Sequence, residues 1–258
     1  MDGKNTTANS ILITGASSGI GQALAYSYAQ SGSTLFLSGR DHNRLNETLT
    51  ECREHGVGAE AETIDVQDRA AMATWISDAD RRNPLDLVIA NAGISGGSGG
   101  IGGEDEEQAR DIFAVNLAGV LNTVLPAISA MKARGNGQIA IMSSLAGFRG
   151  LPGAPAYSAS KVAVRAYGEA LRGALAEDGI QVSVVCPGFV ESRITAANTY
   201  AMPFLMSSAK AAKIIRRGLE RNQARIAFPW PMYAAAWLLS TLPPVLADPI
   251  LRRVPKKS

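Results

Sequence analysis

Short apolar stretches alternate with longer, helix-like stretches along most of this chain, and that alternation constrains the fold more than any other feature. The apolar stretches predict β-strands at residues 11–15, 34–39, 61–65, 85–90, 135–144, 181–186 and 224–228. The segments between them have helical patterns, such as QALAYSYAQ after the first strand. We therefore predict an α/β fold, a doubly wound parallel sheet of about seven strands with helices on both faces. No internal repeat or linker divides the 258 residues.

Three glycines follow the first predicted strand. Gly15, Gly19 and Gly21 lie where glycine allows backbone N–H groups and a helix N-terminus to approach a pyrophosphate. Their G-x-x-x-G-x-G spacing departs from the usual G-x-G-x-x-G dinucleotide pattern, and a plain tight turn would also explain the motif taken alone. Ligands of doubly wound sheets bind at the carboxyl ends of the strands, which is where this turn lies.

Tyr157 and Lys161 are four residues apart, which places them on one face of a predicted helix. An ammonium roughly 4 Å from a phenol, at an effective dielectric of about 20, is worth on the order of 4 kcal/mol, or about three pKa units. Burial opposes this shift because it disfavours the phenolate. The pair can bring the phenol near neutral pH as a general acid or base, although Tyr-x-x-x-Lys also occurs by chance in exposed helices.

The composition excludes several classes of function. Hydrophobic residues make up 46% of the chain and charged residues 19%, which is typical of a soluble globular protein. The formal net charge of +2 provides no global field for nucleic acid. Cys52 and Cys186 are far apart, and His42 and His55 are too few for most metal clusters, so we expect no disulfide and no metal site. The polar N-terminus shows no signal-peptide pattern, and we expect a cytoplasmic protein.

Further motifs complete a recognisable series: TGASSGIG at 14–21, NAG at 91–93, Asn116, Ser144, Tyr157 with Lys161, and Pro187-Gly188. In order and approximate spacing this series resembles the short-chain dehydrogenase/reductase family, over roughly residues 10–195. The resemblance implies a Rossmann-like fold, with residues 1–258 forming a single dinucleotide-binding catalytic domain. It also implies an oxidoreductase acting on a small-molecule substrate, and a homodimer or homotetramer in which the long helices pair.

The resemblance assigns the chemistry to four residues. Tyr157 would deliver or remove the hydroxyl proton, while Lys161 would lower the pKa of Tyr157 and hold the nicotinamide ribose. Ser144 would hydrogen-bond the substrate carbonyl. Ser143 is the neighbouring candidate for that role, but the thirteen-residue gap to Tyr157 favours Ser144. Asn116 would support a water that links Lys161 to solvent.

The family also implies which residues hold a nicotinamide dinucleotide. Asp65 and Val66 would contact the adenine, and Ser192 stands where the family usually has a threonine that binds the nicotinamide amide. The full set carried over, in addition to Tyr157 and Lys161, is Gly15, Ser17, Ser18, Gly19, Ile20, Gly21, Arg40, Asp65, Val66, Asn91, Ala92, Gly93, Pro187, Gly188, Val190 and Ser192.

The end of the second strand bears on the choice of cofactor. An acidic residue there binds the ribose hydroxyls of NAD, whereas a nearby arginine accommodates the 2′-phosphate of NADP. Here the strand ends in Gly39 and Arg40, and no carboxylate occurs before Asp41. Arg40 can bind a phosphate through two parallel hydrogen bonds. We therefore predict NADP(H) over NAD(H); the alternative is that Arg40 is a solvated loop cation.

Two other functions compete with this one. G-x-S-x-G sequences surround Ser17 and Ser98, as in serine hydrolases, but the histidine of that triad should follow the nucleophile and the acid. His42 and His55 precede Ser98 and lie just beyond Ser17. A nicotinamide-binding regulatory protein without turnover would lack a catalytic residue, and none is missing. The sequence therefore favours hydride transfer between NADP(H) and a ketone or secondary alcohol.

Two further segments lie beside the motifs in the sequence. Residues 104–107 are acidic and should occupy the first turn of the long helix that carries Asn116, where the helix dipole favours negative charge. Residues 188–210 correspond to the family's substrate loop. Within that loop, the apolar run 202–206 fits substrate lining and core packing equally well.

Residues 226–258 form an apolar extension beyond the family motifs. No charge occurs between Arg225 and Asp248, and the prolines leave only residues 232–242 for a helix, which is too short to cross a bilayer. A basic sequence follows at residues 252–257. We favour a segment that caps the substrate pocket or packs on a second subunit, with peripheral membrane contact as the alternative. An apolar cap suits a lipophilic substrate.

Overall fold

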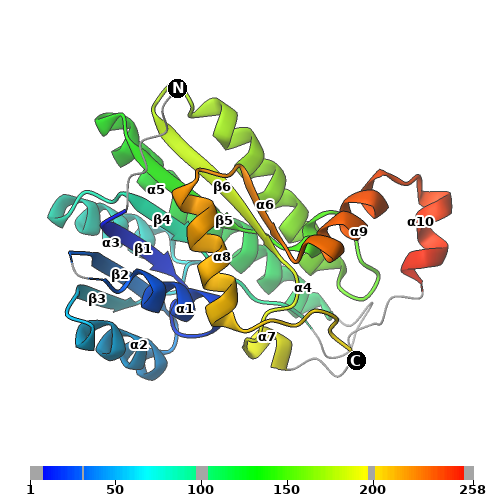
Figure 1. Cartoon of the computed structure of the whole chain (residues 1–258), viewed down its shortest axis with the longest axis horizontal. Helices are drawn as coiled ribbons and strands as arrows, with labels where there is room; N and C mark the ends of the chain where they lie inside the picture. The colour runs from blue at the N-terminus through cyan, green and yellow to red at the C-terminus, as the bar shows by residue number, and fades with distance from the viewer. Residues whose placement is uncertain (1–7, 31, 97–103, 197–200, 253–258) are drawn as a thin grey trace.

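Seven parallel strands form one sheet in the order β3-β2-β1-β4-β5-β6-β7 (Figure 1). The computed structural model describes residues 8–30, 32–96, 104–196 and 201–252. The strands are β1 (Ser10–Thr14), β2 (Thr34–Gly39), β3 (Gly58–Thr63), β4 (Leu87–Ala90), β5 (Gly137–Met142), β6 (Ile180–Pro187) and β7 (Arg225–Phe228). The residues of β1 and β4 are buried throughout, because both faces of the sheet are covered.

Helices form one layer on each face of the sheet (Figure 1). One layer consists of α1 (Gly19–Tyr28), α2 (His42–Glu54) and α8 (Ser208–Glu220). The other consists of α3 (Arg69–Arg82), α4 (Glu106–Phe113), the π-helix η1 (Ala114–Ala118), α5 (Gly119–Arg134) and α6 (Pro155–Ala174). Each layer buries its own apolar cluster against the sheet, so two cores stabilise the fold.

The chain changes direction across the sheet between β1 and β4. From β1 it runs outward through β2 to β3, and it then returns to β4 on the other side of β1. The loops after β1 and β4 therefore diverge and leave a crevice at the carboxyl ends of these strands, where doubly wound folds bind ligands. The predicted fold class is confirmed, and the motifs after β1, β4, β5 and β6 lie along one edge of the sheet.

Several predicted boundaries were wrong by a few residues. β3 ends at Thr63 rather than Asp65, and α6 ends at Ala174 rather than near Asp178. Near the C-terminus, α9 (Trp230–Thr241) begins before the predicted residue 232, and a second helix, α10 (Pro244–Leu251), was not predicted. A proline occupies the second position of α9 and the first position of α10, where the N–H groups have no intrahelical acceptor and their loss costs little.

The predicted long helix is correct with two modifications. Its α4 and α5 portions are joined by the π-helix η1, which contains Asn116. Asp105 caps α4 by accepting a hydrogen bond from the Gln108 N–H at 2.8 Å, and Glu106 and Glu107 lie in the first turn. Glu104 lies outside this helix and is buried, so its predicted position in the first turn was wrong.

One helical run is long and apolar enough to cross a membrane, judged by length and composition alone. This run, Glu106–Arg134, is half buried over its most apolar window. Its α5 portion packs against α3 and against β4 and β5 of the sheet, and that packing accounts for its apolar character.

Two glycines of α6 give a matched test of how this helix packs on the sheet. A Cβ at Gly168 would lie 2.6 Å from Val184 Cγ2 and 3.2 Å from Ile141 Cδ1, whereas a Cβ at Gly173 would meet nothing within 4 Å. We expect Gly168→Ala to lower the free energy of unfolding by about 1–3 kcal/mol through overpacking. Gly173→Ala should be neutral or stabilising by up to about 1 kcal/mol through helix propensity. Urea unfolding followed by circular dichroism measures both; equal effects would contradict this packing.

Candidate active site

A cavity of about 1030 Å³ opens at the carboxyl ends of β1, β4, β5 and β6. This volume is at the upper end of the usual range for ligand sites, about 300–1,000 Å³. Most residues selected from the sequence line it: Gly15, Ser17, Ser18, Gly19, Ile20, Arg40, Val66, Asn91, Ala92, Gly93, Ser144, Tyr157, Lys161, Pro187, Gly188, Val190 and Ser192. Gly21, Asp65 and Asn116 do not line the cavity, and Gly21 and Asn116 support residues that do.

The turn after β1 requires glycine at two positions. Gly15 has a φ of +66°, and a Cβ there would lie 2.8 Å from the Ala92 Cα. A Cβ at Gly21 would lie 2.2 Å from the Gly15 carbonyl oxygen, so α1 packs directly on the turn. Asn91 holds this arrangement from β4 by donating to the carbonyl oxygens of Thr14 at 2.9 Å and Gly15 at 3.2 Å.

This turn fits the pyrophosphate of a dinucleotide. Ser18 occupies the N-cap of α1 but makes no side-chain capping bond, so it leaves the first N–H groups of that helix to other acceptors. A helix N-terminus with its dipole and N–H groups is an anion-binding site. Since the turn tolerates no side chains at Gly15 and Gly21, the backbone itself borders the cavity.

Lys161 is buried at the inner end of the cavity. Its Nζ donates to the Met142 carbonyl oxygen at 3.0 Å, at the end of β5, and lies 5.8 Å from the centre of the Tyr157 ring. Desolvation lowers the pKa of Lys161 to about 8, because burial disfavours the ammonium. At neutral pH the side chain is thus still mostly charged, and its charge lies beside the Tyr157 phenol in poorly solvated surroundings.

Ser144 and Ser143 follow β5 and have different roles. The Ser144 hydroxyl lines the cavity, accepts a hydrogen bond from the Ala146 N–H at 3.1 Å and makes a long bond of 3.4 Å to the Pro187 carbonyl oxygen. The Ser143 hydroxyl instead donates to the Lys161 carbonyl oxygen at 2.8 Å, which attaches β5 to α6. Of these two hydroxyls, that of Ser144 is the one that can exchange its weak hydrogen bond to Pro187 for a hydrogen bond to a substrate.

Asn116 is fully buried behind the cavity and fastens the loop after β4. Its Oδ1 accepts from the Ile94 N–H at 2.8 Å, and its Nδ2 donates to the Ile94 carbonyl oxygen at 2.9 Å and to the Ser160 hydroxyl at 3.1 Å. The π-helical stretch aims this side chain into the fold, as π-bulges at functional sites often do. A Cβ at Gly93 would lie 3.1 Å from Asn116 Oδ1 and 3.3 Å from Lys161 Nζ, so the three residues are neighbours.

Glu104 is a site residue that sequence reasoning missed. Its buried carboxylate accepts hydrogen bonds from the N–H groups of Ala156 at 2.6 Å and Tyr157 at 3.1 Å. It thereby caps α6, which begins at Pro155 and has no side-chain cap of its own. The backbone of Tyr157 is fixed in this way from a loop far away in the sequence.

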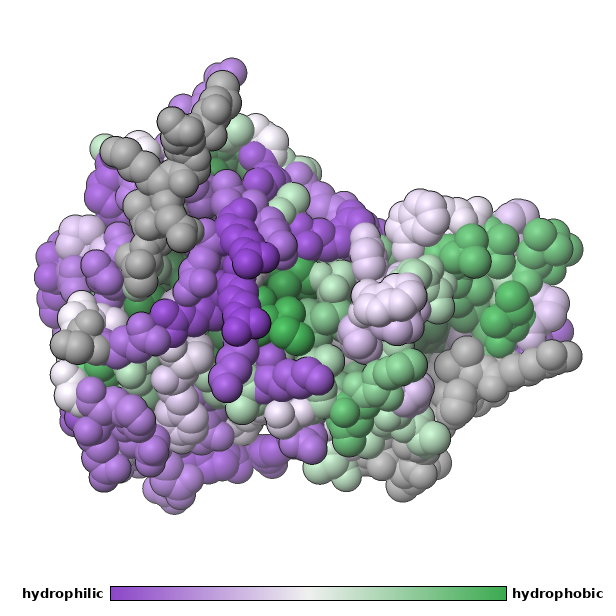
Figure 2. Space-filling model, viewed as in Figure 1, coloured by the Kyte–Doolittle hydropathy of each residue, from purple (hydrophilic) through white to green (hydrophobic). Residues whose placement is uncertain are grey.

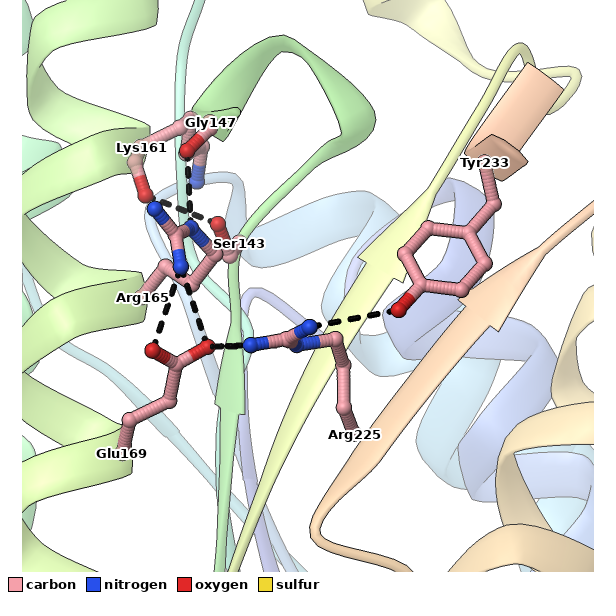
Figure 3. Close-up of polar contacts among 7 residues, drawn as sticks. All are labelled: Ser143, Gly147, Lys161, Arg165, Glu169, Arg225 and Tyr233. Carbon is pink, nitrogen blue, oxygen red and sulfur yellow. Dashed lines mark hydrogen bonds and ion pairs between the residues drawn. The ribbon is translucent and has the colours of Figure 1, made fainter. Parts of the chain in front are cut away.

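A second network, shown in Figure 3, connects α6 to β7 and α9. Glu169 lies between two guanidinium groups, accepting from Arg165 at 3.1 Å and from Arg225 at 2.5 Å. Arg165 also donates to the Gly147 carbonyl oxygen at 2.8 Å, and Arg225 donates to the Tyr233 hydroxyl at 3.2 Å. These contacts join the loop after Ser144 to the C-terminal helices.

The predicted cofactor-choice residue lies at the far end of the cavity. Arg40 lines it and is paired at 3.7 Å with Asp65, the residue expected to meet the adenine. Arg44, from the first turn of α2, also lines the cavity and pairs with Asp41 at 2.7 Å. The Asp41 carboxylate is thus neutralised by Arg44, and it also caps α2 by accepting from the Arg44 N–H at 3.1 Å.

Other lining residues were not predicted. They are Gly39, Asp41, Arg44, Ile64, Ile94, Ser95, Gly96, Gln108, Val115, Met142, Ser143, Arg193, Ile194 and Thr195. Residues 94–96 and 193–195 directly continue predicted motifs, so extending those motifs would have found them. Arg44 and Gln108 belong to helices, and no sequence motif around them indicates that they line a cavity.

The apolar run 202–206 does not line the cavity. Met206 is buried and forms a bridge with Val190, whereas Phe204 and Leu205 are exposed. Core packing is therefore correct for Met206, and the substrate-lining alternative was wrong for these residues. Residues 97–103 and 197–200 of the predicted glycine-rich and substrate loops lie outside the described residues.

The hydrolase alternative lacks a histidine among the described residues that line the cavity. His42 contacts the Thr63 hydroxyl and His55 the Glu51 carbonyl oxygen, and neither lines the cavity. Burial raises the pKa of Cys52 to about 11 and that of Cys186 to about 12, so neither thiol ionises at neutral pH. Ser98 lies outside the described residues, within which no cluster of metal-ligand side chains occurs.

The buried Lys161 predicts a dependence of stability on pH. Its pKa is about 8 in the folded protein, against 10.5 for a lysine fully exposed to water, so between these values only the unfolded state holds the proton. The stability of the wild type relative to Lys161→Met should therefore rise from pH 8 to pH 10.5, by on the order of 3 kcal/mol. Urea unfolding of both proteins without cofactor gives the difference at each pH. A constant difference would show that Lys161 is not desolvated.

Comparisons with known proteins agree with this geometry. The family model described as short chain dehydrogenase matches residues 9–202. An uncharacterized oxidoreductase of Myxococcus xanthus is 38% identical, over 94% of this chain and 96% of its own, and a putative ketoacyl reductase of Streptomyces coelicolor is 37% identical, over 72% of each.

Among solved structures, a short-chain dehydrogenase from Sphingobium yanoikuyae in complex with NADPH matches with a TM-score of 0.78 and 26% identity, over 91% of this chain and 96% of that one. The match to the family model and the identity to these relatives extend over the strands and the cavity described above. This chain therefore belongs to the short-chain dehydrogenase/reductase family and is a nicotinamide-dependent dehydrogenase or reductase.

Proposed function

We propose that this enzyme interconverts a ketone and a secondary alcohol with NADP(H), and that its substrate is lipophilic. The observation that carries the proposal is the meeting of Ser144, Tyr157 and Lys161 in one cavity with the glycine turn after β1. The turn suits a pyrophosphate and the three side chains suit a carbonyl group. Proton transfer and hydride transfer can therefore take place in one enclosed site.

In the reductive direction, the Ser144 hydroxyl gives up its long bond to Pro187 and donates to the substrate carbonyl oxygen. A bound nicotinamide supplies the hydride to the carbonyl carbon. Tyr157 then donates its phenolic proton to the oxygen, which becomes the alcohol hydroxyl, and the Lys161 ammonium stabilises the phenolate that remains. Oxidation reverses each transfer. Asn116, in this proposal, supports a water through which Lys161 exchanges protons with solvent.

The choice of NADP(H) is supported by the charge at the far end of the cavity. Arg40 and Arg44 both line it, and the Nε of Arg44 is buried without a hydrogen-bond partner among the described residues. Two carboxylates lie nearby: Asp41 is paired with Arg44 at 2.7 Å, and Asp65, which does not line the cavity, is paired with Arg40 at 3.7 Å. Two guanidinium groups that line the cavity, with both carboxylates already paired, favour a 2′-phosphate over a free ribose hydroxyl. The NADPH complex of the Sphingobium relative is consistent with this preference.

A lipophilic substrate is supported by the apolar residues beside Ser144. A Cβ at Gly188 would lie 3.3 Å from the Met232 Sδ and 3.4 Å from the Leu145 Cδ1, so α9 packs directly behind Gly188, a residue that lines the cavity. Met232 packs in a cluster with Leu145 and Phe148. A ketone on an acyl chain fits these surroundings, and the similarity to a putative ketoacyl reductase points to the same class.

We also propose that the enzyme is a homodimer or homotetramer through α4 and α5. Phe113 and Leu125 on these helices are exposed. Large apolar side chains that face solvent on neighbouring helices suit a subunit interface.

Removal of the proton donor tests the proposed reaction. Tyr157→Phe should lower kcat by on the order of 10²–10⁴ while leaving the Kd for NADPH within about threefold, because only the proton donor is removed. Lys161→Ala should impair both turnover and cofactor binding. Tyr167→Phe, a partly buried tyrosine of the same helix that lies outside the cavity, is the control and should keep normal activity. Retention of most activity by Tyr157→Phe would disprove the mechanism.

Replacement of the two cavity arginines tests the proposed choice of cofactor. The kcat/KM should favour NADPH over NADH, and Arg40→Ala and Arg44→Ala should each lower the value for NADPH by about tenfold or more. The same variants should change the value for NADH little, because NADH has no 2′-phosphate. Arg81→Ala, an exposed arginine on α3, is the control. A wild-type preference for NADH, or equal losses with both cofactors, would refute the assignment.

A further inference from the structure

The helices α9 and α10 expose more large apolar side chains than any other part of the described chain. They project beyond β7 at one end of the sheet, and Figure 2 shows hydrophobic residues gathered over this end. The exposed side chains, with their exposed fractions, are Trp230 (76%), Trp237 (52%), Leu238 (57%), Val245 (77%), Leu246 (56%) and Ile250 (49%). Monomeric soluble proteins rarely expose so contiguous an apolar surface without a partner for it.

These side chains lie on the outer faces of helices whose inner faces are already packed. On α9, Trp230, Trp237 and Leu238 are spaced i, i+7 and i+8, so they share one face. Met232 and Tyr233 instead pack against the cluster that contains Leu145 and Phe148. On α10, Val245, Leu246 and Ile250 are exposed, whereas Ala247 and Leu251 are buried on another side of the helix.

The fold holds α9 firmly in place. The Tyr233 hydroxyl accepts from Arg225, and its ring meets Phe148 edge-on at 5.5 Å (Figure 3 shows the Arg225 contact). At the other end of the helix, Arg149 donates to the carbonyl oxygens of Leu239 at 3.0 Å and Leu242 at 2.7 Å. The outer apolar residues are therefore presented by an anchored helix, and they contribute little to the packing that anchors it.

The charge in the sequence around this surface is predominantly positive. Residues 226–247 contain no charge, and Asp248 on α10 is the single acidic residue from there to residue 258. Arg252, the C-cap of α10, is exposed, and the sequence continues with Arg253, Lys256 and Lys257. These four cations directly follow the apolar helices in the sequence, and their charge complements an anionic surface.

Neither helix is long enough to span a bilayer. At about 1.5 Å per residue, the twelve residues of α9 cover roughly 18 Å, against a hydrocarbon core of about 30 Å. Tryptophan and leucine side chains on one face, with cations next to them, are instead typical of segments that lie in the interface of a membrane.

We propose that α9 and α10 form a docking surface for an anionic lipid membrane. The outer residues of both helices enter the boundary between headgroups and acyl chains, and the positive charge of Arg252 and of the sequence after it favours anionic headgroups. The proposal does not rest on the enzymatic reaction. If the proposed reaction is also correct, the docked enzyme holds Gly188 and the cavity that it lines close to the bilayer, because α9 packs directly behind Gly188.

Tryptophan fluorescence of the full-length protein tests this directly. Trp230 and Trp237 are exposed, whereas Trp75 is buried, so the first two report the environment of α9. Phosphatidylglycerol vesicles should shift the emission to the blue and co-sediment the protein, and pure phosphatidylcholine vesicles should bind it at least tenfold more weakly. Trp75→Phe should retain the shift. Absence of the shift with phosphatidylglycerol, or equal binding to both lipids, would overturn the proposal.

Variants distinguish docking through this surface from adsorption through any exposed apolar side chain. Leu238→Ser with Val245→Ser should reduce vesicle binding at least tenfold, while Leu205→Ser, at an exposed leucine outside both helices and outside the cavity lining, should not. Replacing Arg252, Arg253, Lys256 and Lys257 by glutamine should weaken binding to phosphatidylglycerol by roughly fivefold per cation. Equal losses in the Leu205→Ser variant and the double variant would contradict docking through α9 and α10.

The competing occupant of this surface is a second copy of the chain. Light scattering without lipid gives the oligomeric state of the wild type and of the Leu238→Ser, Val245→Ser variant, and the proposal expects the two to be the same. If the double variant dissociates a wild-type oligomer and vesicles fail to bind the wild type, the surface is a subunit interface and the membrane proposal is wrong. Intact folding of each variant is verified by circular dichroism.

Discussion

The active site depends on one buried cation. Lys161 loses solvent and receives in return the Met142 carbonyl oxygen at 3.0 Å, so α6 must meet the carboxyl end of β5 for the ammonium to be stable at all. The Ser143 hydroxyl strengthens the same junction through the Lys161 carbonyl oxygen. Because Tyr157 is one turn away on α6 and Ser144 follows Ser143, the contact that compensates the buried charge also places both side chains in the cavity.

The remaining contacts around α6 make that junction rigid. The Glu104 carboxylate caps the N-terminus of the helix beside Tyr157, and Glu169, farther along the helix, binds Arg165 and Arg225. Since Arg165 donates to Gly147 in the loop after Ser144, the N-terminus and the middle of α6 are held against different parts of the fold. Preorganised donors are worth more in such a site than mobile ones, because no reorganisation is needed during the reaction.

The sequence alone predicted the sheet, its helical layers and most of the cavity, because these depend on local patterns and on motifs at strand ends. It did not predict Glu104 correctly, since an acidic run before a helix suggests a helix-dipole contact, whereas its partners on α6 lie 52 and 53 residues away. Arg44 was missed for a related reason: it belongs to a polar helix, and it lines the cavity because α2 begins at His42, shortly after β2 ends at Gly39. The proline-rich end was underestimated, because prolines at the first turn permit the helices that they would break elsewhere.

The central claim is that this cavity transfers a hydride to a carbonyl carbon. The most direct measurement uses NADPH carrying deuterium at one or the other of the two positions on C4 of the nicotinamide, with a 3-oxoacyl thioester as substrate. Mass spectrometry of the product should find deuterium on the carbinol carbon with one labelled cofactor and not with the other, because a nicotinamide held in the cavity would present only one of its faces to a substrate held by Ser144 and Tyr157. The account would be contradicted if neither labelled cofactor gave deuterium on the carbinol carbon, or if both did.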